Sequence, residues 1–425
     1  MPDAPAPAPP GEALLPGRPP PSVSTLLDAL RNEGFDAFLV GGCVRDLLRG
    51  EAVRDFDVAT AAPLERILAL FPRAIPIGMA HGTVMVPSER GPVDVTTYRG
   101  GPRLEDDLAH RDLTVNAMAW DGRAPEPVDP FGGRADLAAR RLRAVGSARE
   151  RLAEDPLRAL RAARLCAQLG FALDPELERA MAETSLEGVA RERLGRELDA
   201  LLLAPHVADA LRLLRRTGLE AQLAPGVGDD AADVVARLPG NRVVRLAGWL
   251  RGAPAESILL RLRFPRALAQ HASRLLARHP LDETLPRDRP AALRRWLNRI
   301  GEQDLAWLVA LRHSELAVRP QTPDVEAARA RLSDLERTTA RLRAEGSLSL
   351  NRGQLALNGQ SVMELLGTGP GPHVGRALEH LLERVLQDPS CNTPERLTAL
   401  LRAWSAAAVT GETGADVSTG RRDEA

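Results

Sequence analysis

Residues 38–46 read Phe-Leu-Val-Gly-Gly-Cys-Val-Arg-Asp, and residues 54–57 read Arg-Asp-Phe-Asp. The apolar run 38–40 predicts a strand, and two glycines directly after a strand let the backbone turn tightly and approach a ligand closely. The helix expected after the turn points free N–H groups outward and carries a partial positive charge. We therefore predict a phosphate-binding turn at Gly41 and Gly42, with Arg45 as an additional bidentate donor.

Asp55 and Asp57 are two residues apart, so on a strand both side chains share one face. Paired carboxylates repel each other unless a cation lies between them, and hard oxygen ligands favour Mg²⁺. Asp94 lies within the β-branched run 93–97 and is the predicted third carboxylate of a catalytic group. Taken singly, each feature is also compatible with an ordinary turn or a solvated strand edge, but their closeness in the sequence favours a site.

The composition limits the class of protein. A chain of 425 residues suits two to four domains, and 44% apolar with 27% charged residues predicts a mainly globular fold. There is no Lys, and the 56 basic residues are balanced by 57 acidic ones, which excludes a uniformly basic nucleic-acid coat. Aromatic residues make up only 3%, which argues against recognition by many stacked bases.

The pattern of elements changes once along the chain. Between residues 22 and 120, short apolar runs alternate with helical stretches, and the runs 83–86 and 93–97 predict a hairpin. From about residue 137 onward, Leu and Arg recur at helical spacing. The Pro- and Ala-rich residues 1–21 and the polar residues 410–425 predict disordered tails. Three widely spaced cysteines and the lack of a long apolar run favour a reducing cytoplasm and no membrane span.

Four further motifs extend the pattern. They are His110–Ala119 with its Arg-Asp-x-Thr-x-Asn-Ala core, Asp129–Leu137, the Glu-Asp-x-x-Arg element at 154–158, and Glu192–Leu198. Together with the glycine turn and the Asp-x-Asp pair, they resemble the class II tRNA nucleotidyltransferases, the family of CCA-adding enzymes and bacterial poly(A) polymerases. The first motif departs from the family pattern at His110 and Leu113.

The resemblance implies an α+β fold. A polymerase beta-like nucleotidyltransferase head with α/β structure is expected at 22–136, followed by an all-α neck (137–204), body (205–345) and tail (346–409). It implies that Asp112 and Asn116 lie near the ribose, and that Arg111, Glu154 and Arg161 also bind the nucleotide. It further implies that Asp155 and Arg158 form a protein template for the incoming base.

Elementary chemistry supports the template. Residues three apart on a helix project together. A carboxylate can accept from the exocyclic amine of C or A, and a guanidinium can donate to the adjacent ring nitrogen. U and G present the opposite pattern and would leave groups unpaired. The alternative interpretation of Asp155, Arg158 and Arg161 is a surface ion-pair ladder.

Two features indicate the subtype. Residues 78–84, Gly-Met-Ala-His-Gly-Thr-Val, resemble the tRNA nucleotidyltransferase version of this strand. The link from Thr97 to Leu104 is short, whereas complete CCA-adding relatives carry a longer flexible loop that serves the switch from C to A. We therefore predict an enzyme that adds two cytidines from CTP to tRNA with Mg²⁺ and leaves the terminal A to a separate enzyme. The alternatives are a full CCA-adding or A-adding enzyme using ATP, a poly(A) polymerase and a non-catalytic RNA-binding protein.

The tRNA is expected to be held by its shape and its phosphates, which guanidinium groups suit. The candidate contacts are Arg274, Arg278, Arg294, Arg295, Arg299 and the turn Gly369–Gly375. Solvated helix faces are the alternative interpretation for each arginine.

Overall fold

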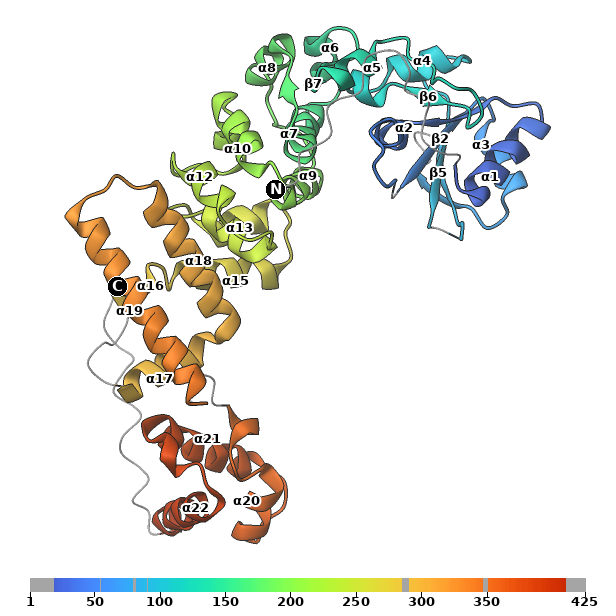
Figure 1. Ribbon diagram of the computed structural model, residues 1–425. Helices are drawn as coiled ribbons and strands as arrows, with labels where there is room; N and C mark the ends of the chain where they lie inside the picture. The colour runs from blue at the N-terminus through green and yellow to red at the C-terminus, as the bar shows by residue number, and fades with distance from the viewer. Residues whose placement is uncertain are drawn as a thin grey trace. The chain divides into compact units, whose positions relative to one another are not determined.

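The computed structural model describes residues 19–53, 55–78, 82–89, 91–284, 290–346 and 351–409 (Figure 1). Most of both predicted tails and residues 79–81 of the predicted tRNA-type strand segment lie outside the described residues. The predicted N-terminal tail ends too late, because Pro19 is buried and a helix already begins at Pro21. Proline suits that first helical position since its φ is fixed near the helical value.

The chain divides into two units, Met1–Ala236 with Gly240–Ala269, and Arg237–Pro239 with Gln270–Ala425. The division lies inside the body that the sequence predicted at 205–345, and the other predicted domain boundaries stay predictions. Each unit is described by itself below.

The first unit begins with alternating helices and strands. Its elements up to residue 142 are α1 (Pro21–Asn32), β1 (Ala37–Val40), α2 (Gly42–Leu48), β2 (Phe56–Thr60), α3 (Leu64–Leu70), β3 (Ile75–Gly78), β4 (Thr83–Val86), β5 (Val93–Thr97), α4 (Leu104–Ala109), η2 (Thr114–Asn116), β6 (Ala119–Trp120), α5 (Gly133–Ala138) and β7 (Arg141–Leu142).

Helices dominate the rest of the first unit. They are α6 (Ala148–Glu154), α7 (Leu157–Leu169), α8 (Pro175–Ala182), α9 (Arg191–Leu203), α10 (Val207–Arg216), α11 (Leu219–Leu223), α12 (Ala231–Ala236), α13 (Arg242–Trp249), α14 (Ala255–Arg261) and the start of α15 (Arg266–Leu276), with one short strand, β8 (Ala172–Leu173), paired with β7.

The described part of the second unit is helical. Its elements after α15 are α16 (Leu281–Thr284), α17 (Pro290–Ile300), α18 (Glu302–Val318), α19 (Pro323–Ala344), η3 (Arg352–Gln354), α20 (Gly359–Leu366), α21 (Pro372–Gln387), η4 (Pro389–Cys391) and α22 (Pro394–Val409). Helices α20 to α22 share one apolar core around Val362, Leu381 and Leu397. None of the described helices is both long and apolar enough to cross a membrane.

A six-stranded sheet in the order β3-β4-β5-β2-β1-β6 forms the framework of the N-terminal region. Strands β4 and β5 pair antiparallel, which confirms the predicted hairpin, and β2 and β5 run parallel. The α+β class with a mostly helical remainder is likewise confirmed. The parallel β2–β5 pair is important for function because it fixes which residues of two distant segments lie side by side.

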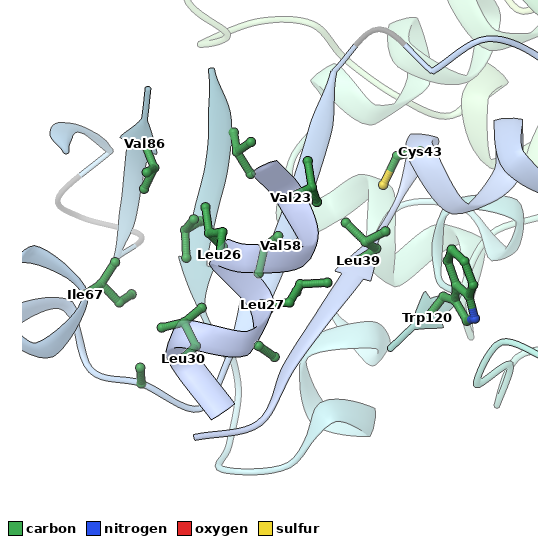
Figure 2. Packing of buried hydrophobic residues seen from close by; sticks show 14 of the residues in the cluster. Val23, Leu26, Leu27, Leu30, Leu39, Cys43, Val58, Ile67, Val86 and Trp120 are labelled. Atoms are coloured by element: carbon green, nitrogen blue, oxygen red, sulfur yellow. The ribbon is translucent and has the colours of Figure 1, made fainter. Parts of the chain in front are cut away.

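One face of this sheet is covered by α1 and α3 (Figure 1). Figure 2 shows Leu26, Leu27 and Leu30 of α1 packed toward Leu39 and Val58 of the sheet. Burial of each such side chain stabilises the folded state by roughly 1.5–3 kcal/mol. This face of the sheet therefore forms part of the hydrophobic core. Because strand side chains alternate, the residues between the core positions project from the opposite face.

Candidate active site

Three carboxylates gather where β2 begins. Asp57 of β2 lies opposite Asp94 of β5 in the parallel register, so both project from the face that faces away from α1. Asp55 lies two residues before Asp57 and is exposed. Burial raises the pKa of Asp57 to about 6, and although Arg111 lowers it, Asp94 and Asp55 add to the rise. Burial and Asp55 also raise the pKa of Asp94. The protein thus concentrates negative charge where water cannot fully solvate it.

The glycine turn lies directly beside this acidic group. Gly41 precedes α2 with φ of 78°, a conformation that side-chain-bearing residues rarely adopt. A Cβ placed on Gly41 would be 3.0 Å from Nη1 of Arg111 and 3.4 Å from Oδ2 of Asp57. The missing side chain therefore leaves a small space bounded by a guanidinium and a carboxylate, which suits a phosphate with its counter-ion.

Replacing Gly41 with Ala is expected to destabilise the protein by about 1–3 kcal/mol and to raise the Kd for a nucleoside triphosphate, because the methyl group strains the backbone and fills that space. The matched control is Gly50→Ala, since Gly50 has φ of 70° but nothing within 4 Å of its Cβ position. Thermal melts should show both variants destabilised. A Kd for the triphosphate that changes equally in both would contradict a ligand-binding role for the space at Gly41.

Arg111 is held in place by a buried acid that the sequence analysis missed. Asp107 of α4 is fully buried and accepts hydrogen bonds from Nε and Nη2 of Arg111 at 3.2 and 3.0 Å, and from Nε of Arg99 at 2.9 Å. Burial would raise the pKa of Asp107, but Arg111 and Arg99 lower it below its ordinary value. The two arginines are thereby fixed at the site, with Nη1 of Arg111 directed to the glycine turn. The i, i+4 spacing of Asp107 and Arg111 was the available signal.

Arg45 lies beside the glycine turn, since a Cβ placed on Gly42 would be 3.4 Å from its Nη2. It is buried, donates from Nε and Nη2 to the two carboxylate oxygens of Asp46 at 2.9 Å each, and donates from Nη1 to Oδ1 of Asn116 at 2.7 Å. It does not line the cavity described below. Three of its N–H groups are used in these contacts, which orient Asn116, and its role as a phosphate donor stays a prediction.

Asp112, Asn116 and Arg161, which were each predicted to bind the nucleotide, lie together in the structure. Asp112 accepts from Nε of Arg161 at 2.8 Å and, more weakly, from Nδ2 of Asn116 at 3.4 Å. Although burial works against ionisation of Asp112, Arg161 lowers the pKa of that carboxyl. Arg161 lies on α7, in the helical region that carries the predicted template. Its hydrogen bond to Asp112 thereby links this region to the motif that follows α4.

The predicted template residues lie at the junction of α6 and α7. Asp155 follows α6 and accepts from the backbone N–H of Leu157 at 3.1 Å and from Nη2 of Arg193 at 2.8 Å. Arg158 donates to Glu154 at 2.6 Å and to the backbone oxygen of His110 at 3.0 Å. Asp155 and Arg158 therefore do not pair with each other, and both remain directed toward the cavity. Because Asp155 pairs with Arg193 and Arg158 pairs with Glu154, the template stays a prediction beside the ion-pair alternative.

A cavity of about 1010 Å³ joins the acidic group, the glycine turn and the template. Asp55 and Arg45 are absent from its lining, whereas seven lining residues were not predicted as site residues: Val40, Val58, Thr83, Thr96, Arg99, His110 and Arg193. Its full lining is Val40, Gly41, Gly42, Asp57, Val58, Thr83, Asp94, Thr96, Arg99, His110, Arg111, Asp112, Asn116, Glu154, Asp155, Arg158, Arg161 and Arg193. A volume of this size accommodates a nucleoside triphosphate.

The acidic group fits a hard cation in its chemistry. Its donors are carboxylate oxygens, and burial, together with Asp94 and Asp55, raises the pKa of Asp57, so a bound cation would favour the ionised form. Among the described residues, no three His, Cys, Asp or Glu side chains form a group that could hold a metal ion by themselves. An open set of oxygens is the arrangement expected where substrate phosphates complete the coordination of Mg²⁺.

The arginines proposed for tRNA contact are partly engaged within the second unit. Arg294 donates to the backbone oxygens of Leu386 and Gln387, at 2.7 Å each, and so caps the end of α21. Arg295 pairs with Glu383, and Arg278 lies 3.7 Å from Asp304. Two N–H groups of Arg294 are therefore used within the protein, and its contact with tRNA stays a prediction, as do those of Arg278 and Arg295. Arg274, Arg299 and the turn Gly369–Gly375 stay predictions.

Known proteins share these features. Residues 37–143 match the poly A polymerase head domain family, and residues 170–230 match the family described as a probable RNA and SrmB-binding site of polymerase A. The CCA-adding enzyme of Geobacillus kaustophilus is 34% identical over 406 residues, covering 88% of this chain and 95% of that protein. The CC-adding tRNA nucleotidyltransferase of Shouchella clausii is 43% identical over 200 residues, covering 47% and 52%.

A solved structure agrees with these relatives. The CCA-adding enzyme of Bacillus stearothermophilus in complex with CTP is similar with a TM-score of 0.70 and 31% identity, covering 92% of this chain and 98% of that one. Together with the glycine turn, the paired carboxylates and the arginine-lined cavity, these similarities show that the chain belongs to the CCA-adding tRNA nucleotidyltransferase family and is a nucleotidyltransferase.

Proposed function

We propose that this protein adds two cytidines from CTP to the 3′ end of tRNA and then stops. The observation that carries the proposal is the short, fixed connection between β5 and α4, residues 98–103. A template that must accept first C and then A needs a segment whose movement changes the positions of the template side chains. A template that cannot be re-aimed rejects ATP once the two cytidines are in place.

Hydrogen bonds and close packing hold the connection between β5 and α4 at several points. Arg99 donates to the buried Asp107, and the backbone N–H of Tyr98 donates to the carbonyl of Thr60 at 2.9 Å. Gly100 lies so close to His110 that an added Cβ would be 2.0 Å from Cε1 of that ring. Because Arg158 in turn donates to the carbonyl of His110, the same connection restrains one of the two template residues.

The reaction follows from the cavity. Asp155 accepts from the exocyclic amine of cytosine, and Arg158 donates to its ring nitrogen and O2. Arg111 and the backbone at Gly41 and Gly42 receive the triphosphate, while Asp112, Asn116 and Arg161 lie where the ribose is expected. The 3′-hydroxyl of tRNA attacks the α-phosphate and pyrophosphate leaves toward the glycine turn. Catalysis here consists mainly of positioning and charge stabilisation.

We assign a divalent cation, Mg²⁺, to the oxygens of Asp55 and Asp57, with Asp94 beside them. When bound, it would neutralise phosphate charge and favour ionisation of the attacking hydroxyl. The raised pKa of Asp57 supports this assignment because ionising this buried carboxyl costs free energy that a bound cation would offset. Without a bound cation, Asp57 is the carboxylate of this group whose ionisation costs the most free energy.

Incubation with tRNA that lacks its last three nucleotides tests the proposal. We expect CTP to extend this tRNA by two residues and ATP to give no further addition, as read on a sequencing gel. Addition of A after the two cytidines would instead support a full CCA-adding enzyme, the activity named for the Geobacillus relative. Tailing of unstructured RNA with ATP would support a poly(A) polymerase, and no incorporation at all would support a non-catalytic RNA-binding protein.

Completion of the tRNA by a separate A-adding enzyme follows from a stop after two cytidines. We also propose that the protein acts in the cytoplasm. Three free cysteines, of which Cys43 and Cys166 are buried, support a reducing compartment.

A further inference from the structure

The sheet carries an apolar surface that the reaction described so far does not use. Ile75 and Ile77 of the edge strand β3 are 50% and 53% exposed, the largest exposures among the large hydrophobic side chains of the described residues. Single exposed apolar residues are common, but two on one edge strand form a patch that needs an explanation.

Strand register places Ile75 on the catalytic face. Asp57 lies opposite Asp94, Asp94 lies opposite Met85 of β4, and Met85 lies opposite Ile75. Directly opposed residues project from the same face, so the four side chains form one row across four strands. With neighbouring strands about 4.8 Å apart, Ile75 lies roughly 10 Å from Asp94. Ile77 lies next to this row, at the irregular pairing between Pro76 and Gly78.

The direction from which the tRNA 3′-hydroxyl attacks indicates which part of the substrate lies on this surface. In phosphoryl transfer, the attacking and leaving oxygens lie roughly in line on opposite sides of the phosphorus. Pyrophosphate leaves toward Gly41 at the end of β1, and β1 lies on the far side of β2 from β5. The attacking hydroxyl must therefore approach from the side of β5, β4 and β3. The nucleosides that carry it then lie over Met85, Ile75 and Ile77.

A second chain pairing with the β3 edge is less suitable. Pro76 lies in the middle of β3 and has no N–H to donate to an added strand. The strand is thus poorly suited to backbone pairing, while its side chains remain available.

We infer that Ile75, Ile77 and Met85 form the subsite for the last nucleosides of the single-stranded tRNA acceptor end. Isoleucine and methionine pack against the faces of unstacked bases without reading their hydrogen-bonding edges. Such a contact suits an enzyme whose acceptor base changes after each addition, because every base presents an apolar face. The inference rests on the proposed function and deepens it by naming the acceptor subsite.

The test is the variant Ile75→Ser/Ile77→Ser, with Val128→Ser as a matched control. Val128 is 37% exposed and lies opposite Ala119 of β6, at the other edge of the sheet from β3. We expect the double variant to raise the KM for tRNA roughly tenfold, with the KM for CTP and kcat nearly unchanged, since it removes two partly buried apolar contacts from the acceptor alone. The control should match the wild type in all three constants.

A second variant gives a gain of binding. Ile75→Trp is expected to lower the KM for tRNA, because an indole stacks on a base more favourably than an isoleucine packs. Its added fluorescence should be quenched by an RNA hairpin that ends in the acceptor strand. The inference is wrong if the wild type incorporates CTP but the double variant keeps the wild-type KM for tRNA. It is equally wrong if the double variant changes only the oligomeric state. A wild type that incorporates nothing would overturn the proposed function itself.

Discussion

Asp57→Asn is expected to lower the rate of cytidine incorporation by roughly 1,000-fold, the size of effect that follows the loss of one central electrostatic group. The change keeps the shape of the side chain and removes one negative charge from the group of Asp55, Asp57 and Asp94. Single-turnover incorporation of CTP into tRNA measures the rate. Glu65→Gln on the exposed face of α3 is the control for loss of one acidic charge and should behave as the wild type.

The same variant is expected to be more stable than the wild type in the absence of metal. Burial raises the pKa of Asp57 from 3.8 to about 6, so the folded protein holds that proton more tightly than the unfolded chain does. The proton on Asp57 stabilises the folded state fully below about pH 4, and this stabilisation is lost as the pH rises through 6. At neutral pH the ionised carboxylate lowers the free energy of unfolding by about 1–3 kcal/mol. Asp57→Asn removes that cost.

Thermal melts in chelator and in Mg²⁺ measure this effect. The Tm of the variant should exceed that of the wild type at pH 7.5, and the difference should shrink toward pH 4. Added Mg²⁺ should raise the Tm of the wild type and leave the variant nearly unchanged, because a ligand stabilises only the state that binds it. A variant that loses both activity and stability would show that Asp57 has a structural role instead.

Arg158→Ala is expected to reduce the preference for CTP over UTP by roughly 100-fold. The guanidinium is the donor to the cytosine ring, and without it the site no longer penalises the opposite hydrogen-bonding pattern of uracil as strongly. The loss should fall mainly on kcat/KM for CTP, with a smaller change for UTP. Competition between the two nucleotides on one tRNA substrate measures the ratio directly.

The control for this variant is Arg149→Ala, because Arg149 lies on the neighbouring α6, is 77% exposed and pairs with Glu183 at the surface. It should keep the wild-type preference. If Arg158→Ala and the wild type preferred CTP over UTP equally, the role of Arg158 would be limited to the hydrogen bond that links α7 to the carbonyl of His110. The base would then be read by other groups.

Much of the site could be predicted from local patterns. The glycine turn, the Asp-x-Asp pair and the hairpin that carries Asp94 each depend on residues close in sequence, where strand alternation and turn chemistry act. The positions of Gly41, Asp57 and Asp94 in one cavity agree with those patterns. The predicted helical pattern after residue 137 likewise agrees with α6 to α14.

Features that depend on distant partners could not be predicted. Nothing in the sequence indicates that Arg45 turns to Asp46 and Asn116, because a helix offers an arginine several acceptors and packing selects among them. Arg294 is a similar case, since its acceptors are backbone oxygens at the end of α21. The row from Asp57 to Ile75 required strand register, which follows from long-range pairing and not from any single segment.

The central claim is that the acidic group binds a divalent cation beside the triphosphate, with cytosine facing the template. Anomalous diffraction from crystals grown with Mn²⁺ and CTP tests it most directly. We predict a manganese peak against the oxygens of Asp55 and Asp57, with the triphosphate at Gly41 and Arg111 and the base at Asp155 and Arg158. A nucleotide bound at a different surface, with no peak at these carboxylates, would contradict the account.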